Sequence, residues 1–230
     1  MLLSIIIPCY NSEKYIRETL ESVKNQKFQD WECIIVNDGS TDSSEEIIRA
    51  CIKDDSRFKL ITTDNHGCAA ARNVCLKHAQ GKYIFPLDSD DILMPNFTYW
   101  GVHYLEHHPD ISLFYGNIEY VGVKASYVYE TPYKNYADYL NNMCLCSSGL
   151  YKRDRALEIG GYDENILRED AEFWIRYLYK NDFVALTPSI SIQYRQRRDS
   201  RHHKITREQD KMFHQIIREK HKSIYQECHA

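Results

Sequence analysis

Apolar runs and helical patterns alternate through the first ninety residues, and this alternation limits the fold more than any other feature of the sequence. The apolar runs lie at residues 2–9, 31–36, 58–61 and 83–87. All four are short, and the first is nearly continuous and rich in β-branched residues, as a strand covered on both faces is. Between them apolar residues recur at helical spacing, for example at Ile16, Leu20 and Val23. This rhythm predicts an α/β fold with a mostly parallel sheet, right-handed crossovers and helices on both faces.

The second half of the sequence predicts a smaller, mixed part of the same fold. A helix is expected at residues 96–107, followed by antiparallel strands at 111–120 and 121–129. A helical stripe that includes Phe173 and Trp174 precedes two short strands at 183–186 and 189–194. A basic loop and a last helix at about 205–225 end the chain. We therefore expect one domain in two halves, residues 1–95 and 96–195, with an appendage at 196–230.

Composition favours an ordinary globular protein. Of the 230 residues, 43% are hydrophobic and 27% charged, and the formal net charge of −4 gives no reason to expect binding to nucleic acid. The apolar start ends at Pro8, far short of the ~20 residues that cross a bilayer, and no signal peptide is visible. The eight cysteines are scattered, as reduced thiols are. The sequence therefore predicts a cytoplasmic protein.

A basic run at residues 195–207 leaves three interpretations open. It holds six Lys or Arg residues against one acid, Asp199. It can close over a diphosphate, or it can rest on anionic lipid in a peripheral contact with the inner face of the membrane. A solvated loop is the plainer alternative for most of its members.

Polar clusters follow three of the predicted strands, at the edge where parallel α/β sheets bind ligands. They lie at residues 10–11, 37–40 and 88–91. Together they can form a nucleotide-sized cleft, in which Tyr10 offers a ring face to a base and Asp38 accepts a hydrogen bond from a base N–H. A half-buried core aromatic and a helix cap are the alternatives for these two residues. No Gly-x-Gly-x-x-Gly follows the first strand, which weighs against a dinucleotide site.

The acidic cluster after the fourth strand is a candidate metal site. In an extended backbone Asp88 and Asp90 project to one side and Ser89 to the other. Two carboxylates so close raise each other's pKa unless a cation lies between them. Oxygen ligands at the mouth of a sheet suit Mg²⁺ or Mn²⁺, with water and substrate phosphates completing the shell. An acidic surface turn that includes Asp91 is the alternative, and the cluster alone does not decide between them.

Two further acids, Glu169 and Asp170, lie at or just before the start of the helix that carries Phe173. Acids are routine there because the helix dipole favours negative charge. The same place also lets a carboxylate point into a cleft as a base. This stretch leaves both interpretations open.

The ordered set of motifs resembles glycosyltransferase family 2, a large family of inverting enzymes with the GT-A fold. The matching stretches are residues 4–11 (SIIIPCYN), 36–42 (VNDGSTD), Gly67 with 71–73 (ARN), 81–83 (GKY), 87–91 (LDSDD), 160–164 (GGYDE) and 169–170 (ED). They cover about residues 3–180, in the family's order and approximate spacing. Each motif is weak alone, whereas the ordered set is specific.

The resemblance implies a metal-dependent inverting transferase that moves a sugar from a nucleoside-diphosphate donor to a hydroxyl group. Residues 1–95 would bind the nucleotide-sugar and residues 96–195 the acceptor. UDP is the family's commonest nucleotide. The acceptor would be a saccharide or a lipid-linked molecule in bacterial surface polysaccharide or lipooligosaccharide synthesis.

The resemblance also assigns roles in donor binding. Asp38 resembles the residue that contacts the base, in a pocket lined by Pro8 and Tyr10. Arg72 and Asn73 match the Ala-Arg-Asn segment beside the donor.

The remaining assignments concern the metal and the base. Asp88, Ser89 and Asp90 match the Asp-x-Asp segment that faces the donor. Asp90 is expected to bind Mg²⁺ or Mn²⁺ directly, and Asp88 to hold the ribose or the water shell of the metal. Asp170 matches the acid taken as general base.

Some positions depart from the family pattern. Asn37 replaces the more frequent Asp, and Pro86 is unusual before the Leu-Asp pair. The C-terminal Tyr-Arg-x-His pattern is present as residues 194–197 (YRQR), without its histidine, so His202 and His203 are left out of the metal site.

Two other functions are alternatives. A sugar-phosphate nucleotidyltransferase would need a Gly-rich basic loop after the first strand, which residues 8–11 (PCYN) lack. An inactive sugar-nucleotide binding module would be expected to have lost a metal carboxylate or the base, and both are present. The sequence therefore favours an enzyme.

Overall fold

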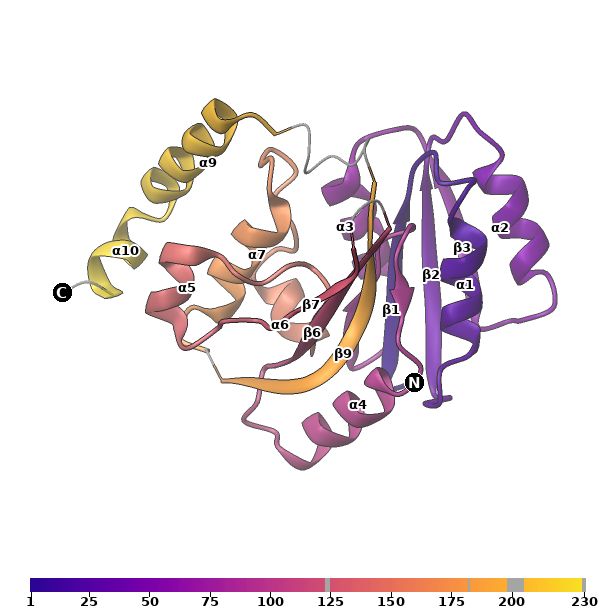
Figure 1. The fold of residues 1–230 in the computed structure, drawn as a ribbon, viewed down its shortest axis with the longest axis horizontal. Coiled ribbons are helices and arrows are strands. Elements are labelled where there is room, and N and C mark those ends of the chain that lie inside the picture. Colours follow the sequence, from indigo (N-terminus) through magenta and orange to yellow (C-terminus); the bar gives the residue numbers. More distant parts are fainter. Residues whose placement is uncertain (123–124, 182, 198–204, 229–230) are drawn as a thin grey trace.

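The computed structural model describes residues 1–122, 125–181, 183–197 and 205–228. In this part of the chain the strands form one nine-stranded sheet in the order β3-β2-β1-β4-β8-β6-β9-β5, and β7 pairs with β6 at its side (Figure 1). Helices flank both faces of the sheet, as the sequence predicts.

The first half of the sheet is parallel and follows the predicted alternation. Its strands are β1 (Leu3–Cys9), β2 (Trp31–Asp38), β3 (Phe58–Thr63) and β4 (Tyr83–Pro86). The connecting helices are α1 (Ile16–Lys24), α2 (Ser44–Ile52) and α3 (Cys68–His78). Every residue of β1 is buried, because β2 and β4 pair with it on either side and helices cover both faces.

The second half of the sheet is mixed. β8 (Leu150–Lys152) runs antiparallel to β4 and to β6 (Leu113–Gly122), and β7 (Tyr127–Tyr129) is antiparallel to β6. β9 (Val184–Gln196) is parallel to β6, and β5 (Ile92–Leu93) is antiparallel to β9. The helices are α4 (Phe97–His107), α5 (Tyr136–Asn142), α6 (Arg153–Glu158), α7 (Glu169–Leu178), α9 (Arg207–Lys220) and α10 (Lys222–Cys228). The helix at 96–107 and the antiparallel pair within 111–129 are confirmed.

Two predicted elements differ from the structure. The strands expected at 183–186 and 189–194 form one strand, β9, that continues through Pro188. Gly116 of β6 pairs with Thr187 and the next residue with Ile190, so the proline lies in a bulge where its missing N–H breaks no ladder bond. The last helix expected at about 205–225 is two helices, α9 and α10, which meet at His221.

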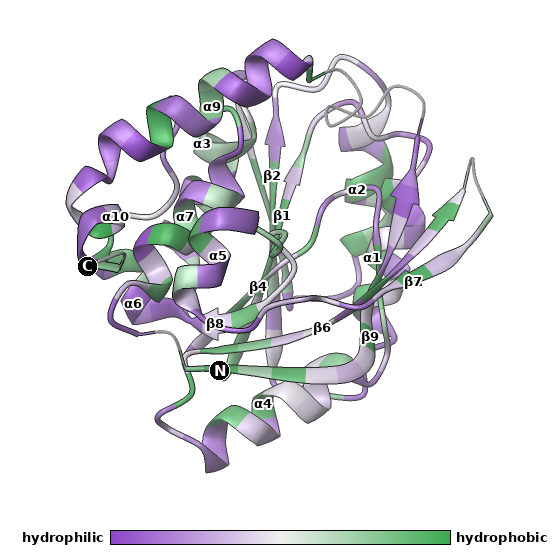
Figure 2. Ribbon diagram, turned by 60° about the vertical axis from the view of Figure 1, so that its left-hand side comes forward, coloured by the Kyte–Doolittle hydropathy of each residue, from purple (hydrophilic) through white to green (hydrophobic). Residues whose placement is uncertain are grey.

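Side chains of the sheet alternate between two hydrophobic layers. Ile6 of β1 belongs to the layer that includes residues of α3, α7 and the C-terminal helices, whereas Ile5 and Ile7 belong to the layer that includes residues of α1, α2 and α4. Figure 2 shows hydrophobic strands between helices whose outer faces are hydrophilic. No helix among the described residues is both long enough and apolar enough to span a membrane.

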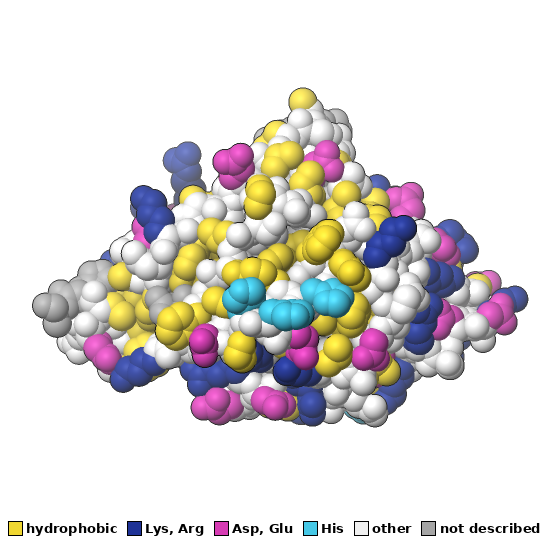
Figure 3. Space-filling view, turned by 90° about the horizontal axis from the view of Figure 1, so that it is seen from below, with side chains coloured by type: hydrophobic (Ala, Val, Ile, Leu, Met, Phe, Trp, Pro, Cys, Tyr) yellow, Lys and Arg dark blue, Asp and Glu magenta, His cyan; other side chains and the backbone are white. Residues whose placement is uncertain are grey.

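The helix α4 exposes aromatic side chains on the outside of the molecule. The ring of Tyr99 contacts those of Trp100 and His103, and Tyr104 stacks on His108. Hydrophobic and histidine side chains gather on this face, which is seen from below in Figure 3.

A buried carboxylate, Glu172, holds the C-terminal helices to α7. It accepts hydrogen bonds from Arg176 Nη2 (2.6 Å) and Lys220 Nζ (2.6 Å), and His221 Nε2 lies 3.0 Å from its Oε1. Burial alone would raise the pKa of Glu172, but these partners outweigh it and hold the pKa well below its usual value. Arg176 also donates to the carbonyl of Gly161. Glu172 therefore ties α9, α10 and the loop before α7 to one helix.

Replacing Glu172 should destabilise the fold. Glu172→Gln removes the charge that Arg176, Lys220 and His221 share. We expect the free energy of unfolding at pH 7 to fall by about 3 kcal/mol in guanidinium chloride denaturation. The exposed Glu208→Gln on α9 is the matched control and should change it by less than about 0.5 kcal/mol. Equal losses in both variants would contradict the anchoring role.

The same variant has a defined pH dependence. The folded pKa of Glu172 lies below the unfolded value of about 4.3, so its stabilisation is complete above that pH. The stabilisation is lost as the pH falls toward the folded pKa. The deficit of Glu172→Gln should therefore shrink below about pH 4.

Candidate active site

The loops after β1, β2 and β4 meet at the carboxyl edge of the parallel strands. Asn11 N–H donates to Ser40 Oγ (3.0 Å), and Asn11 Oδ1 accepts from Thr41 N–H (2.8 Å), which joins the first two loops. The hydroxyls of Ser12 and Ser89 lie 2.7 Å apart and join the first loop to the acidic one. The structure thus brings the three predicted polar clusters together.

Asp38 is buried at the end of β2, and its carboxylate is bonded to the chain. Oδ1 accepts from His66 N–H (2.9 Å) and Oδ2 from Gly67 N–H (2.8 Å), just before α3 begins. Pro8 is buried in β1, whereas the Tyr10 side chain is 50% exposed. The carboxylate oxygens keep lone pairs for a further donor. The base contacts expected of Asp38, Pro8 and Tyr10 stay predictions.

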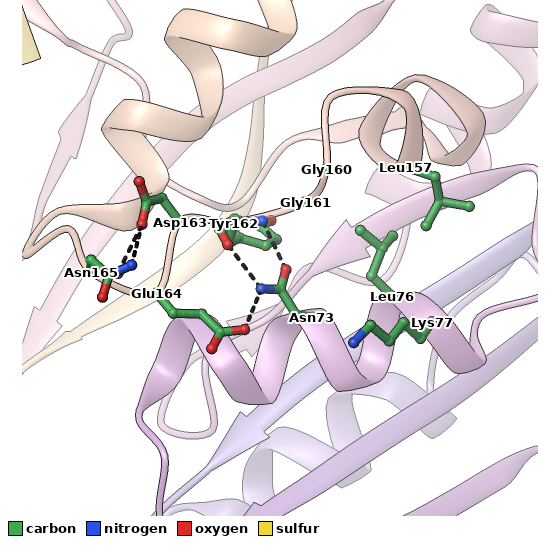
Figure 4. Close-up of a pocket in the computed structure, with 10 residues that line it drawn as sticks. All are labelled: Asn73, Leu76, Lys77, Leu157, Gly160, Gly161, Tyr162, Asp163, Glu164 and Asn165. Carbon is green, nitrogen blue, oxygen red and sulfur yellow. Dashed lines mark hydrogen bonds between the residues drawn. The ribbon is translucent and has the colours of Figure 1, made fainter. Parts of the chain in front are cut away.

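Asn73 binds the Gly-Gly-Tyr turn of the protein itself. Its Nδ2 donates to Tyr162 O and to Glu164 Oε1, both at 2.8 Å, and its Oδ1 accepts from Tyr162 N–H at 2.8 Å (Figure 4). A Cβ at Gly161 would lie 2.5 Å from Asn73 Oδ1, and the φ of Gly161 is +71°, so glycine is required there. The Asn73 side chain therefore holds the turn against α3, and its expected contact with a donor stays a prediction.

A pocket of about 370 Å³ lies between α3 and this turn, and it is lined by Asn73, Leu76, Lys77, Leu157 and residues 160–165 (Figure 4). None of Asp88, Asp90 and Asp170 lines it. The pocket is therefore separate from the acidic residues singled out by the sequence.

The guanidinium of Arg72 joins the two ends of the candidate site. Arg72 is only 3% exposed, and its Nη2 lies 2.6 Å from Asp88 Oδ1 while its Nη1 lies 2.8 Å from Glu169 Oε1. Asp88 follows β4 and Glu169 begins α7, so one buried cation holds both elements to α3. The sequence analysis did not predict that Arg72 and Glu169 join these elements. The one sequence signal for it was that Arg72 follows three alanines at the otherwise apolar start of α3. The bridge brings Asp170, the residue after Glu169, to the edge that carries Asp88.

Basic residues of the β9 end hold the acidic loop. The buried Asp91 accepts from the backbone N–H of Arg195 (2.9 Å), and the backbone carbonyl of Asp90 accepts from Arg195 Nε (3.0 Å). Asp90 Oδ2 pairs with Arg197 Nε at 2.8 Å. Burial and the charge of Asp88 raise the pKa of Asp90 to about 6, although Arg197 opposes the rise. Arg195 and Arg197 of the basic run are therefore bound to acids of the chain itself.

The donor set of the acidic loop fits a hard divalent cation. Asp88 and Asp90 offer carboxylate oxygens, and Mg²⁺ or Mn²⁺ is commonly held by one or two carboxylates plus water and substrate phosphates. Within the described ranges no three His, Cys, Asp or Glu side chains form a ready-made metal site. His202 and His203 lie outside the described residues. The metal site expected at Asp88 and Asp90 stays a prediction.

Asp170 is the second residue of α7. Its Oδ1 accepts from Ala171 N–H at 2.9 Å, a contact within the first turn. Burial and the charge of Glu169 raise the pKa of Asp170, against the opposing charges of Arg72 and Arg168. A carboxyl group with a raised pKa is suited to take a proton from an alcohol. The catalytic role of Asp170 stays a prediction.

A sequence profile described as Glycosyl transferase family 2 matches residues 4–158, well over half of the chain. The chain belongs to this family. It is similar to the putative teichuronic acid biosynthesis glycosyltransferase TuaG of Bacillus subtilis, with 45% identity over 91 residues. The aligned residues make up 39% of this chain and 36% of that relative. This family member thus spans little more than a third of the length of that relative.

Solved structures share the fold of this family member. S. aureus TarS 1–349 in complex with UDP-GlcNAc matches with a TM-score of 0.77 and 23% identity, over 90% of this chain and 62% of that one. Mannosyltransferase PcManGT from Pyrobaculum calidifontis, in complex with GDP-Man and Mn²⁺, matches with a TM-score of 0.72 and 19% identity, over 94% and 64% of the two chains. The expected GT-A fold is confirmed.

Removing the Arg72 bridge should cost more stability than removing an exposed ion pair. Arg72→Met leaves the buried Glu169 carboxylate without its cation, and we expect a loss of about 3–5 kcal/mol in urea denaturation. Arg49→Met, which breaks the exposed pair with Glu45, should cost less than about 1 kcal/mol.

A second substitution separates the bridge from general packing. Adding Glu169→Gln to Arg72→Met should recover part of the loss, because the two side chains are coupled. Additive losses, or an Arg72→Met variant as stable as Arg49→Met, would argue against the bridge.

Proposed function

We propose that this family member is a metal-dependent inverting glycosyltransferase. It moves a sugar from a UDP-linked donor to a hydroxyl group of a saccharide or lipid-linked acceptor, in surface polysaccharide or lipooligosaccharide synthesis. The observation that carries the proposal is the Arg72 bridge, because it joins the acidic loop after β4 to the helix start that holds Asp170. The relative named for teichuronic acid biosynthesis supports the polysaccharide assignment, and TarS bound to UDP-GlcNAc supports the UDP donor.

The donor is bound at the carboxyl edge of the sheet. Asp38 accepts a hydrogen bond from the base, and Tyr10 and Pro8 line the base pocket. Ser89 lies in the loop that faces the sugar-nucleotide, where its hydroxyl is fixed by Ser12. Arg72 positions Asp88. The Asn73 side chain acts through the turn that it holds beside the donor.

Asp90 and Asp88 are the residues that would hold Mg²⁺ or Mn²⁺. When bound there, the ion supplies Lewis-acid stabilisation of the negative charge on a departing diphosphate. The Mn²⁺ and GDP-Man in the PcManGT structure support this choice of cation. Arg197 pairs with Asp90 and offsets part of the negative charge of the acidic loop.

Asp170 prepares the acceptor. An alcohol is a poor nucleophile until a base takes its proton, and the raised pKa of Asp170 suits that step. As the proton moves to the carboxylate, the acceptor oxygen bonds to the anomeric carbon on the face opposite the diphosphate. The bond from that carbon to the diphosphate oxygen breaks, and its electron pair leaves with the diphosphate. The configuration of the anomeric carbon is therefore inverted.

Removing the base should stop transfer and spare donor binding. Asp170→Asn keeps the size of the side chain, and we expect UDP release from UDP-sugars with saccharide acceptors to fall by about 10³-fold. Thermal shifts measured with UDP or GDP and Mn²⁺ should match those of the wild type. The exposed Asp154→Asn on α6 is the control and should retain transfer. Wild-type transfer by Asp170→Asn would reject Asp170 as the base.

Cation binding should depend on the protonation of Asp90. A metal binds the ionised carboxylate, so protons compete as the pH falls through the pKa of about 6. Calorimetry of Mn²⁺ without nucleotide, whose terminal phosphate would titrate in the same range, should show affinity about tenfold weaker at pH 5 than at pH 7. Asp90→Asn should lose most of the affinity together with the pH step, whereas Asp154→Asn keeps both. A flat pH profile in the wild type would count against Asp90 as a ligand.

A further inference from the structure

Tyrosines on three neighbouring strands form a row across the sheet. Tyr120 of β6 is in register with Tyr127 of β7 on one side and with Tyr194 of β9 on the other. The Tyr120 and Tyr127 rings stack with centroids 4.9 Å apart and planes 4° apart, and the Tyr194 ring lies 5.0 Å from that of Tyr120. Directly paired residues share one face of a sheet. The three rings therefore form one surface, here called the tyrosine row.

One end of the tyrosine row lies at the acidic loop. Tyr194 precedes Arg195, whose backbone N–H binds Asp91 and whose guanidinium binds the Asp90 carbonyl. Burial, and after it the charges of Asp91, Asp88 and Asp90, raise the pKa of Tyr194. The row thus begins beside the carboxylates that the proposed function assigns to the donor.

The other end of the tyrosine row is open. Tyr127 is 48% exposed, on a hairpin of β6 and β7 that extends from the sheet (Figure 2). Tyr120 and Tyr194 pack against the hydrophobic layer of the sheet, so the strand needs those two rings for its own stability. Tyr127 has one face on Tyr120 and much of its surface in solvent, so strand formation alone does not account for it.

A ring held in this way is a preformed binding face. Stacking on Tyr120 fixes its orientation, so little conformational freedom is lost when a ligand covers it. Tyrosine offers an apolar face with a hydroxyl at its edge. A pyranose ring has the matching chemistry, since its C–H bonds form an apolar face and its hydroxyls form a polar rim.

We propose that the outer face of Tyr127, backed by Tyr120, binds a sugar ring of the acceptor. The inference rests on the proposed function, and it names the acceptor as a saccharide chain rather than a single sugar. The three strands of the row span about 10 Å from Tyr194 to Tyr127. A sugar on Tyr127 is therefore not the one that reacts at the acidic loop, and at least one further ring separates them.

Saturation-transfer difference NMR on the full chain tests the inference, with lactose, maltose and chitobiose as probes. The wild type should saturate ring C–H protons of at least one disaccharide. Tyr127→Phe keeps the ring face and should keep the signal. Tyr127→Thr and Tyr127→Ile keep strand propensity without a ring, and both should weaken binding about fivefold. Tyr99→Ala removes an exposed tyrosine on α4 and should leave the signal unchanged.

Thermal shift with UDP or GDP and Mn²⁺, on the same proteins, separates this inference from the proposed function. Loss of disaccharide binding in the Thr and Ile variants, with nucleotide binding intact, supports the role of Tyr127. Unchanged disaccharide binding in these variants overturns it and leaves the proposed function standing. The inference is also overturned, and the proposed function stands, if the Tyr127 variants lose UDP binding and keep disaccharide binding. If neither nucleotide binds to the wild type, the proposed function fails and this inference fails with it.

Discussion

The arrangement of the candidate site depends on one buried cation, the guanidinium of Arg72. A charge that is almost fully removed from water is costly unless it is paired, and breaking such a pair costs more than the pair itself contributes. The carboxylates that meet it come from the end of β4 and from the start of α7, 97 residues away from Arg72 in the second case. The requirement to satisfy Arg72 therefore sets the position of α7, and with it Asp170, relative to the acidic loop.

The helix α7 is also held along its length. Glu172 accepts hydrogen bonds from Arg176 and Lys220 and lies within hydrogen-bond distance of His221. These contacts bind the C-terminal segment to α7. Arg176 and Asn73 both hold the loop before α7, by donating to the carbonyls of the adjacent residues Gly161 and Tyr162. A general base must be placed within hydrogen-bond reach of its proton, and a helix fixed at its start and along its length would provide that placement for the base proposed at Asp170.

The sequence predicts those parts of the structure that local pattern determines. The strand β1 is continuous and apolar because both of its faces are buried, and that pattern is visible without any partner. β5 has two residues and β8 has three, and each forms only because distant strands pair with it. No local sequence pattern therefore predicts these two strands. Pro188 suggests a break between two strands, yet a bulge opposite Gly116 lets β9 continue. The Arg72 pairs were missed for the same reason as β5: they join distant segments.

Repulsion among the carboxylates of the acidic loop is opposed by residues at the end of β9 and just after it. Three carboxylates lie within residues 88–91, just after β4, and their mutual repulsion would disfavour the fold if nothing opposed it. The backbone N–H of Arg195 in β9 donates a hydrogen bond to Asp91, and Arg197, just after β9, forms an ion pair with Asp90. Because β9 also carries Tyr194, the strand that neutralises the acids is the strand from which the tyrosine row starts. The contacts that hold the acidic loop therefore also fix where the tyrosine row lies relative to that loop.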